Sequence, residues 1–468
     1  MSTSTLKKID FTSGKIVGKI IVFALPMAIA TILQMLFNAA DIAIVGQFSG
    51  ENGSIYQGAV GATSSLSHLV INLFVGVGTG AGIVMANAFG AKDEKSQHRI
   101  VHSSFALALV SGCIVMVIGM LIARPMLSIM NTPSDVIDYS TTYLIIYFAG
   151  APGMMVYNFL SSLLRGVGET KKPLFYLFVS GILNVIANVI TVVFLKMNVA
   201  GVAIATTLAQ YVSAILVTKD MLKADGGMKL SFKNVRLYKK EVRNILFMGV
   251  PMGLSACCFS ISNILIQSNI NTFGADAIAG NSNAGNIEVI LDTFAVAVAN
   301  TIATAVGQNM GAKKVDRIGK VVLIGGSMCL SLQIVSSLTV LIFGKYLAMI
   351  YSSDPSVIEW SLKRMKTVGC FMFLISLMHV FGSGLKGMGD SIIPLVSNIL
   401  FTCVVRVLYM LFVYPYLPNT FELIQITYPI TWFLSGVVQM IMYFVRKNKI
   451  IKTMKNHEVE QTESENVA

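Results

Sequence analysis

One carboxylate stands in one of the most apolar regions of the chain. Asp41 is the only charged residue of the segment 37–48, which reads FNAADIAIVGQF. An acid there either marks a helix end in water or binds a cation or a proton, because ionisation away from water is costly. Polar residues of other apolar stretches are candidate partners that can hydrogen-bond a protonated carboxyl group, offer oxygens to Na⁺, or hold helices together: Gln34, Asn184, Asn188 and Thr206.

A second group of charges lies in apolar stretches of the C-terminal half. Glu288 and Asp292 are four residues apart, which places them on one face of a helix. Because buried charges pair, we expect Arg406 to neutralise one of these acids. Two roles stay open for this cluster, a static ion pair and a part in substrate binding or coupling. His379 and His68 each stand alone in an apolar stretch, either as packing residues or as proton relays.

Composition indicates that the elements carrying these residues are membrane helices. Of the 468 residues, 54% are hydrophobic and 12% charged, and the mean hydropathy is +0.72. Soluble domains carry about 25% charged residues. The apolar runs reach about 20 residues or more, enough to cross the bilayer as helices, and they lack the alternation of a membrane barrel. The net charge of +12 comes from short loops, so it indicates membrane topology and not nucleic-acid binding.

The sequence predicts an all-α polytopic membrane protein with twelve transmembrane helices. The predicted spans are 16–48, 57–86, 98–122, 136–160, 170–194, 199–219, 242–272, 281–307, 318–343, 357–382, 391–415 and 422–446. Most of the 35 Lys and Arg residues fall in alternate loops and in the two ends of the chain. By the positive-inside rule both termini are cytoplasmic, as expected for a multi-pass protein of a bacterial inner (cell) membrane.

The two halves of the chain resemble each other. GAK occurs at 90–92 and 311–313, VIDYS at 136–140 matches VIEWS at 357–361, and RGVGETKKP at 165–173 matches KGMGDSIIP at 386–394, each pair 221 positions apart. We therefore expect two six-helix repeats related by a pseudo-two-fold axis along the membrane normal, with a cavity between them. The predicted parts are a cytoplasmic N-terminus (1–15), an N-lobe (16–219), a cytoplasmic linker (220–241), a C-lobe (242–446) and a disordered cytoplasmic tail (447–468).

Several motifs resemble the multidrug and toxic compound extrusion (MATE) family. The first span carries its Pro, Gln, Asp and Val-Gly pattern, ALPMAIATILQMLFNAADIAIVGQF. VGQNMGAKK at 306–314, FLSSLLRGVGETKKP at 159–173 and LNVIAN at 183–188 are similar to three further family motifs. The matches cover about residues 14–447, and the pattern is closer to the DinF-like and MepA-like branches. Many relatives carry an acid where Asn188 stands, and its absence weakens a two-carboxylate or Na⁺ interpretation.

The resemblance implies a secondary active exporter that exchanges organic cations or amphiphilic compounds for protons or Na⁺. Asp41 would be the coupling site of the N-lobe, and Pro26 removes a backbone hydrogen bond, so the first span can bend there. Some of the 26 Met and 26 Phe residues could line an adaptable substrate cavity, although most are ordinary core or lipid-facing residues. The candidates for that cavity are Met35, Phe37, Phe74, Phe294 and Met378.

Two alternative functions remain. A lipid-linked precursor flippase of the same superfamily would need a cationic cavity, and a membrane enzyme or receptor would need a convergent catalytic set. The sequence has no P-loop, catalytic triad or metal cluster. We therefore expect no enzyme activity, no bound metal and no cofactor other than H⁺ or Na⁺ as coupling ion. The expected partners are small-molecule substrates and membrane lipids, not nucleic acid, and we expect a monomer.

Overall fold

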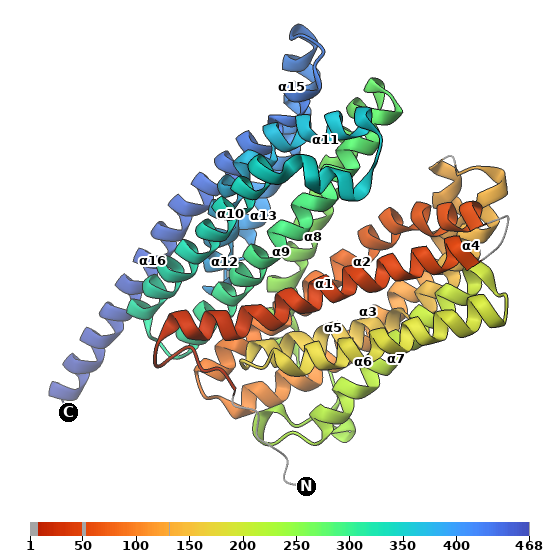
Figure 1. Cartoon of the computed structure of the whole chain (residues 1–468). Helices are drawn as coiled ribbons and strands as arrows, with labels where there is room; N and C mark the ends of the chain where they lie inside the picture. Colours follow the sequence, from red (N-terminus) through yellow and green to blue (C-terminus); the bar gives the residue numbers. More distant parts are fainter. Residues whose placement is uncertain (1–7, 49–52, 131, 468) are drawn as a thin grey trace. The chain divides into compact units, whose positions relative to one another are not determined.

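The secondary structure is helical throughout the part of the chain that the structure describes (Figure 1). The computed structural model describes residues 8–48, 53–130 and 132–467, and these contain no strand. The predicted all-α class is therefore confirmed. Helices suit this composition because a helix satisfies its backbone hydrogen bonds within one segment, as a bilayer requires.

The first half of the chain forms long helices joined by short turns. They are α1 (Ile16–Phe48), α2 (Gly53–Gly90), α3 (Glu94–Ile129), α4 (Ser134–Ala149), α5 (Ala151–Gly166), α6 (Lys171–Asn188) and α7 (Asn198–Leu222). A π-helical segment, η2 (Val189–Phe194), continues α6. Two short 3₁₀ turns, η3 (Gly226–Met228) and η4 (Phe232–Asn234), lie in the predicted linker.

The second half has the same kind of helices with more interruptions. It consists of α8 (Lys239–Ile270), η5 (Asn271–Phe273), α9 (Ala275–Gly311), α10 (Val315–Tyr351), α11 (Pro355–Thr367), η6 (Gly369–Leu374), α12 (Ile375–Gly387), α13 (Ile392–Asn398), η7 (Ile399–Val405), α14 (Arg406–Leu408), η8 (Tyr409–Val413), η9 (Tyr414–Tyr416), α15 (Phe421–Gln425) and α16 (Thr427–Val467). The segments η7 and η8 are π-helical.

The helices confirm the number of predicted spans. Within the described residues, eleven helices are long and apolar enough to cross a membrane, and α4 with α5 make a twelfth candidate as a pair bent by 48°. The predicted span 136–160 is thus two helices that meet at Gly150. Pro152 lies in the first turn of α5, where its missing N–H costs no helical hydrogen bond. The predicted span 357–382 is broken as well, at Phe371 (φ −106°, ψ 15°).

The structure repeats the sequence duplication in detail. Lys92 and Lys313 end α2 and α9 with positive φ angles of 57° and 56°. Gly168 and Gly389 follow α5 and α12 with φ angles of 89° and 84°, a left-handed conformation that glycine adopts without a steric penalty. The Ser140 hydroxyl donates to the carbonyl of residue 59 at 3.2 Å, and the Ser361 hydroxyl donates to that of residue 280 at 3.1 Å. All three pairs are 221 positions apart, so the two halves share their turns and some helix contacts.

The chain forms two compact units that differ from the predicted lobes at two places. Unit 1 comprises residues up to Asp10 and Leu25–Cys257, and unit 2 comprises Phe11–Ala24 and Cys258–Ala468. The first turns of α1 therefore pack with unit 2, and the first part of α8 packs with unit 1. The boundary in α1 falls one residue before Pro26.

The C-terminal tail differs from its prediction. The sequence predicts disorder from residue 447, whereas α16 continues to Val467. The polar residues of this segment include several Glu, Lys and Gln, which are good helix formers and extend a helix that is already nucleated by its apolar part.

Small apolar clusters surround the polar residues of interest in each unit. In unit 1, Val45, Tyr143 and Val202 belong to one buried cluster close to the last turns of α1. In unit 2, one cluster contains Ile266, Trp432 and other residues of α8, α15 and α16. These clusters fix the rotation of the helices and so decide which polar side chains face each other.

Candidate functional site

The Asp41 carboxylate lies in a buried polar site of unit 1, between α1, α6 and α7. Asp41 is 6% exposed. The Asn188 amide donates to its Oδ1 at 2.5 Å, and the Thr206 hydroxyl donates to its Oδ2 at 3.1 Å. The Asn184 amide donates to Thr206 Oγ1 at 3.3 Å. Three of the four predicted partners are therefore brought together around Asp41.

Helix geometry explains why these partners converge. Asn184 and Asn188 are four residues apart on α6, so they share one face, and Asn188 also donates to Asn184 Oδ1 at 3.4 Å. Thr206 is one of the few polar residues in the middle of α7. No ion pair joins Asp41 to a cationic side chain among the described residues. The carboxylate is therefore held by neutral donors alone.

Gln34 is not part of this site. It lies seven residues before Asp41 on α1, about 10 Å along the helix axis, and its side chain is exposed. No hydrogen bond from Gln34 to the Asp41 cluster is present in the described part of the chain. The prediction that Gln34 is a partner of Asp41 is wrong for this structure, because sharing a helix face does not bring two side chains within reach.

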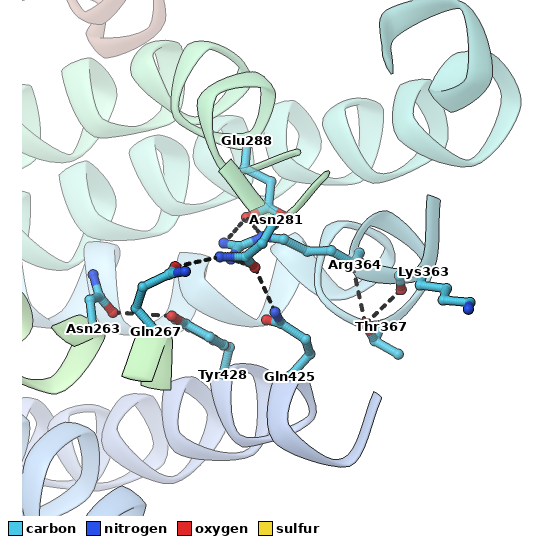
Figure 2. Close-up of polar contacts among 9 residues, drawn as sticks. All are labelled: Asn263, Gln267, Asn281, Glu288, Lys363, Arg364, Thr367, Gln425 and Tyr428. Atoms are coloured by element: carbon cyan, nitrogen blue, oxygen red, sulfur yellow. Dashed lines mark hydrogen bonds and ion pairs between the residues drawn. The ribbon is translucent and has the colours of Figure 1, made fainter. Parts of the chain in front are cut away.

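A second buried polar network lies in unit 2 (Figure 2). The Arg364 guanidinium of α11 holds the Glu288 carboxylate of α9 with Nη2 to Oε2 at 2.7 Å, and Nε lies 3.2 Å from both carboxylate oxygens. Each of these side chains is 10% exposed. The pair is therefore a buried salt bridge with fork geometry.

Amide side chains extend this network, and the close-up shows them converging on Asn281 of α9 (Figure 2). Asn281 Oδ1 accepts from Arg364 Nη1 and from the Gln425 amide, both at 2.7 Å. The Asn281 amide donates to Gln267 Oε1 of α8 at 2.8 Å. The salt bridge joins α9 and α11, and the amides extend the network to α8 and α15.

The prediction that Arg406 neutralises Glu288 or Asp292 is wrong. Arg406 Nε donates to Thr431 Oγ1 at 3.0 Å and Nη1 donates to Ser262 Oγ at 3.2 Å. The guanidinium also lies over the Tyr428 ring, 4.3 Å from its centroid. Arg364 takes Glu288 instead, because α11 packs against α9 and Arg364 lies on the buried face of α11.

Asp292 has a different set of partners from Glu288. Its Oδ1 accepts a short hydrogen bond from the Gln333 amide of α10 and lies 3.2 Å from His379 Nε2 of α12. The Asp292 and His379 side chains are 23% and 18% exposed. His379 is therefore not isolated, and the His68 side chain lies outside the described residues.

The five residues proposed for a substrate cavity lie in different surroundings. Met378 is 7% exposed and belongs to an apolar core of unit 2, so it is a packing residue here. Phe74 is half-buried and packs against the core of unit 1. Met35 and Phe37 are half-buried on α1, and Phe37 lies against Gly181 of α6. Phe294 is 39% exposed on α9.

The motif at 306–314 has a clear structural task in unit 2. The buried Phe11, before α1, donates its backbone N–H to Gln308 Oε1 at 2.9 Å. Its carbonyl accepts from the Asn309 amide at 3.2 Å and from Arg317 Nε at 2.7 Å. Gln308 and Asn309 therefore hold the segment before α1 in place by hydrogen bonds to the backbone of Phe11.

Sequence reasoning missed the buried roles of Arg364, Gln333, Gln425 and Tyr428. In the sequence Arg364 lies beside Lys363 and Lys366, where it resembles a charge of a loop. Its spacing gave a signal, because positions 357, 361, 364 and 365 form the buried face of α11, and only one of the three basic residues falls on that face. Among the described residues, no group of three or more His, Cys, Asp or Glu side chains could hold a metal ion.

Comparison with known proteins agrees with the helical order and the duplication. The MatE family model matches residues 26–190 and 251–412, one match in each half. The chain is 26% identical to the probable multidrug resistance protein NorM of Thermotoga maritima, over 81% of each chain. It is 24% identical to the probable multidrug resistance protein YpnP of Bacillus subtilis, over 86% of this chain and 89% of that protein, and 21% identical to the multidrug export protein MepA of Staphylococcus haemolyticus, over 81% and 83%.

Solved structures share the fold at low sequence identity. A transporter of the MOP superfamily from Pyrococcus furiosus superposes with a TM-score of 0.88 at 20% identity, over 96% of this chain and 99% of that one. An outward-facing multidrug resistance MATE family transporter gives the same TM-score, identity and coverage. Because the family model covers most of both repeats, the chain belongs to the MatE family, the multidrug and toxic compound extrusion transporters, and is a multi-pass membrane protein.

Proposed function

We propose that this protein is a secondary active exporter in which Asp41 couples the inward movement of a proton to the export of an organic cation or amphiphilic compound. The observation that carries the proposal is a buried carboxylate, 6% exposed, that is held by the neutral donors Asn188 and Thr206. An acid inside a membrane protein that lacks a cationic partner marks a proton or ion pathway more readily than a structural contact.

The partners of Asp41 support exchange between a charged and a neutral form. In the ionised form, the carboxylate accepts from Asn188 Nδ2 and Thr206 Oγ1. The Asn188 Oδ1 atom is buried and has no hydrogen-bond partner among the described residues. A half-turn of this amide would offer Oδ1 to a protonated Asp41, and the same oxygen could instead contact Na⁺. Asp41 is the one acid of this site among the described residues, which favours the proton, because Na⁺ sites gain from a higher ligand charge.

Pro26 is proposed as the hinge that connects this site to transport. It lies inside the continuous helix α1, and the chain passes from unit 2 to unit 1 between Ala24 and Leu25. Proline lacks the N–H that would bond to the carbonyl four residues earlier, which makes bending there less costly. Protonation of Asp41 would change the polar contacts of the last turns of α1, and bending at Pro26 would accompany the alternating access of the two lobes.

The remaining features of the proposal follow from the loop charges and the family. We place the protein in a bacterial inner membrane with both termini in the cytoplasm, acting as a monomer on small molecules without a metal or an organic cofactor and without enzyme activity. A lipid-linked precursor flippase is the second candidate, and one observation favours it: Arg406 is buried without an acidic partner among the described residues.

The test is export of ethidium, a fluorescent organic cation, from proteoliposomes under an imposed proton gradient or sodium gradient. The proposal expects proton-driven export by the wild type and its loss in Asp41→Asn. Asp138→Asn is the matched control in the same unit, because that carboxylate is exposed and pairs with Arg124 at 2.9 Å.

Three results would change the proposal. Export that is driven by sodium and lost in Asp41→Asn would make the Asp41 site a Na⁺-binding site. Unchanged export by Asp41→Asn would refute Asp41 as the coupling residue and direct attention to Asp292 and His379. Absence of ethidium export by the wild type under either gradient would refute the cation-export function itself.

A further inference from the structure

Unit 2 contains a buried arginine whose charge no carboxylate balances in the described part of the chain. Arg406 is 2% exposed and lies within the apolar span Ile392–Tyr416. No ion pair involves it among the described residues, since Glu288 pairs with Arg364 and Asp292 contacts His379. A lone buried guanidinium is costly, because transfer from water removes its hydration. Such a residue inside a membrane segment normally has a partner or a function.

The hydrogen bonds of Arg406 leave part of the guanidinium available. Nε donates to Thr431 and Nη1 donates to Ser262. Nη2 is buried and has no hydrogen-bond partner among the described residues. The two occupied nitrogens fix the plane of the guanidinium, so the direction of the remaining N–H groups is set in advance. A preorganised donor of this kind binds an anionic oxygen with less loss of side-chain entropy.

The Tyr428 ring brings a second arginine, Arg364, close to Arg406. The ring lies 4.3 Å from the Arg406 guanidinium and 5.3 Å from that of Arg364. Two arginines therefore contact one aromatic ring. Glu288, which accepts from Arg364 (Figure 2), is the one acid paired with these arginines among the described residues. These side chains together carry one surplus positive charge, which favours binding of an anionic group.

Tyr428 also connects the buried guanidinium with a more accessible residue. Its hydroxyl donates to Asn263 Oδ1 at 3.3 Å, as the close-up shows (Figure 2). The Asn263 side chain is exposed, and its amide N–H groups are a second set of donors beside the ring. Rotation of Tyr428 away from Asn263 would uncover Arg406 from this side.

We propose that Arg406, Tyr428 and Asn263 bind an anionic group, a carboxylate or a phosphate, of compounds that this protein exports. The inference rests on the proposed export function and extends its substrate class from cations to anionic and zwitterionic compounds. Arg406 Nη2 donates to the anionic oxygen in a charge-assisted hydrogen bond, the Asn263 amide donates a second hydrogen bond, and Tyr428 contacts the apolar part of the compound.

The first experiment measures binding of two aromatic dyes of opposite charge, fluorescein and ethidium, to the purified full-length protein. Loss of one charge-assisted hydrogen bond corresponds to a rise in Kd of about tenfold or more. We expect such a rise for fluorescein in Arg406→Gln, partial recovery in Arg406→Lys, and an unchanged Kd for ethidium. Arg124→Gln is the matched control, because that arginine is exposed and pairs with Asp138.

Asn263→Leu provides a test that does not disturb the buried charge. This side chain is exposed, so the variant is expected to fold even if Arg406→Gln does not, and it should weaken fluorescein binding in the same direction. An unchanged fluorescein Kd in Asn263→Leu and in a folded Arg406→Gln protein would overturn the proposal.

A transport assay distinguishes two possible ligands of the Arg406 site: a compound that the protein exports, and an anion that stays bound, such as a lipid headgroup. We expect proteoliposomes of the wild type to export fluorescein and those of Arg406→Gln to lose this export while still exporting ethidium. Fluorescein that binds but is never exported would overturn its assignment as a substrate. Absence of ethidium export by the wild type would instead refute the proposed export function. Failure of the anion-binding proposal and failure of the proposed function therefore give different results.

Discussion

The Arg364–Glu288 salt bridge offers the sharpest test of the network in unit 2. At 2.7 Å between Nη2 and Oε2, the attraction is about 6 kcal/mol with an effective dielectric constant of about 20. Desolvation of two groups that are each 10% exposed offsets most of this attraction. The intact pair therefore contributes little net stability, whereas one partner without the other leaves an uncompensated buried charge.

We predict that Glu288→Leu lowers the free energy of unfolding by about 3–5 kcal/mol, and that Arg364→Met does the same. The double variant should recover most of this loss, because it buries no charge. The more exposed pair Lys363–Glu359, at 3.1 Å on the same helix as Arg364 and with side chains 35% and 70% exposed, is the matched control. Its Glu359→Gln variant, which leaves Lys363 over the Trp360 ring, should change stability by less than about 1 kcal/mol.

The assay is reversible unfolding of the purified protein in mixed detergent micelles, followed by tryptophan fluorescence, with ethidium export measured in parallel. If both single variants lose less than about 1 kcal/mol, the reasoning about an uncompensated buried charge is refuted. If the double variant recovers stability and also exports ethidium normally, the pair is a static anchor. If it recovers stability without export, the pair takes part in transport.

Three further predictions concern packing, the segment before α1 and a helix cap. Gly253→Ala should cost about 1–3 kcal/mol of stability, because a Cβ there would lie 2.2 Å from the Leu73 carbonyl oxygen, while Gly58→Ala, with no atom within 4 Å, should not destabilise. Arg317→Gln removes the donor to the carbonyls of residues 11 and 13 and should speed tryptic cleavage before α1. The control Lys320→Gln changes an exposed side chain and should leave the cleavage rate unchanged. The Ser96 backbone N–H lowers the pKa of Asp93 at the start of α3. Asp93→Ala should therefore cost about 1 kcal/mol at neutral pH. Chemical unfolding should show this difference shrinking as the pH falls from about 4, the ordinary pKa of an aspartate in the unfolded chain, through the lower pKa that Asp93 has in the folded protein.

Much of the fold follows from the sequence alone. Apolar runs of bilayer length predicted twelve spans because each helix must satisfy its own backbone in lipid. The repeated motifs predicted two similar halves, which share turns such as those at Gly168 and Gly389. The Asp41 site was also largely predictable. Asn184 and Asn188 share a helix face by their spacing, and polar side chains in apolar helices must find each other.

Only the tertiary structure decided which charges meet across helices. Spacing assigned Glu288 and Asp292 to one face of α9, but their partners depend on the rotation and breaks of other helices. The packing of α11 against α9 brings Arg364 to Glu288, and the packing around α14 leaves Arg406 against Tyr428, which no periodicity in a single helix could reveal. In the same way, α1 carries Gln34 away from its expected site, and its first turns pack with unit 2. A sequence pattern fixes the face of a helix, whereas the packing of neighbouring helices fixes what that face contacts.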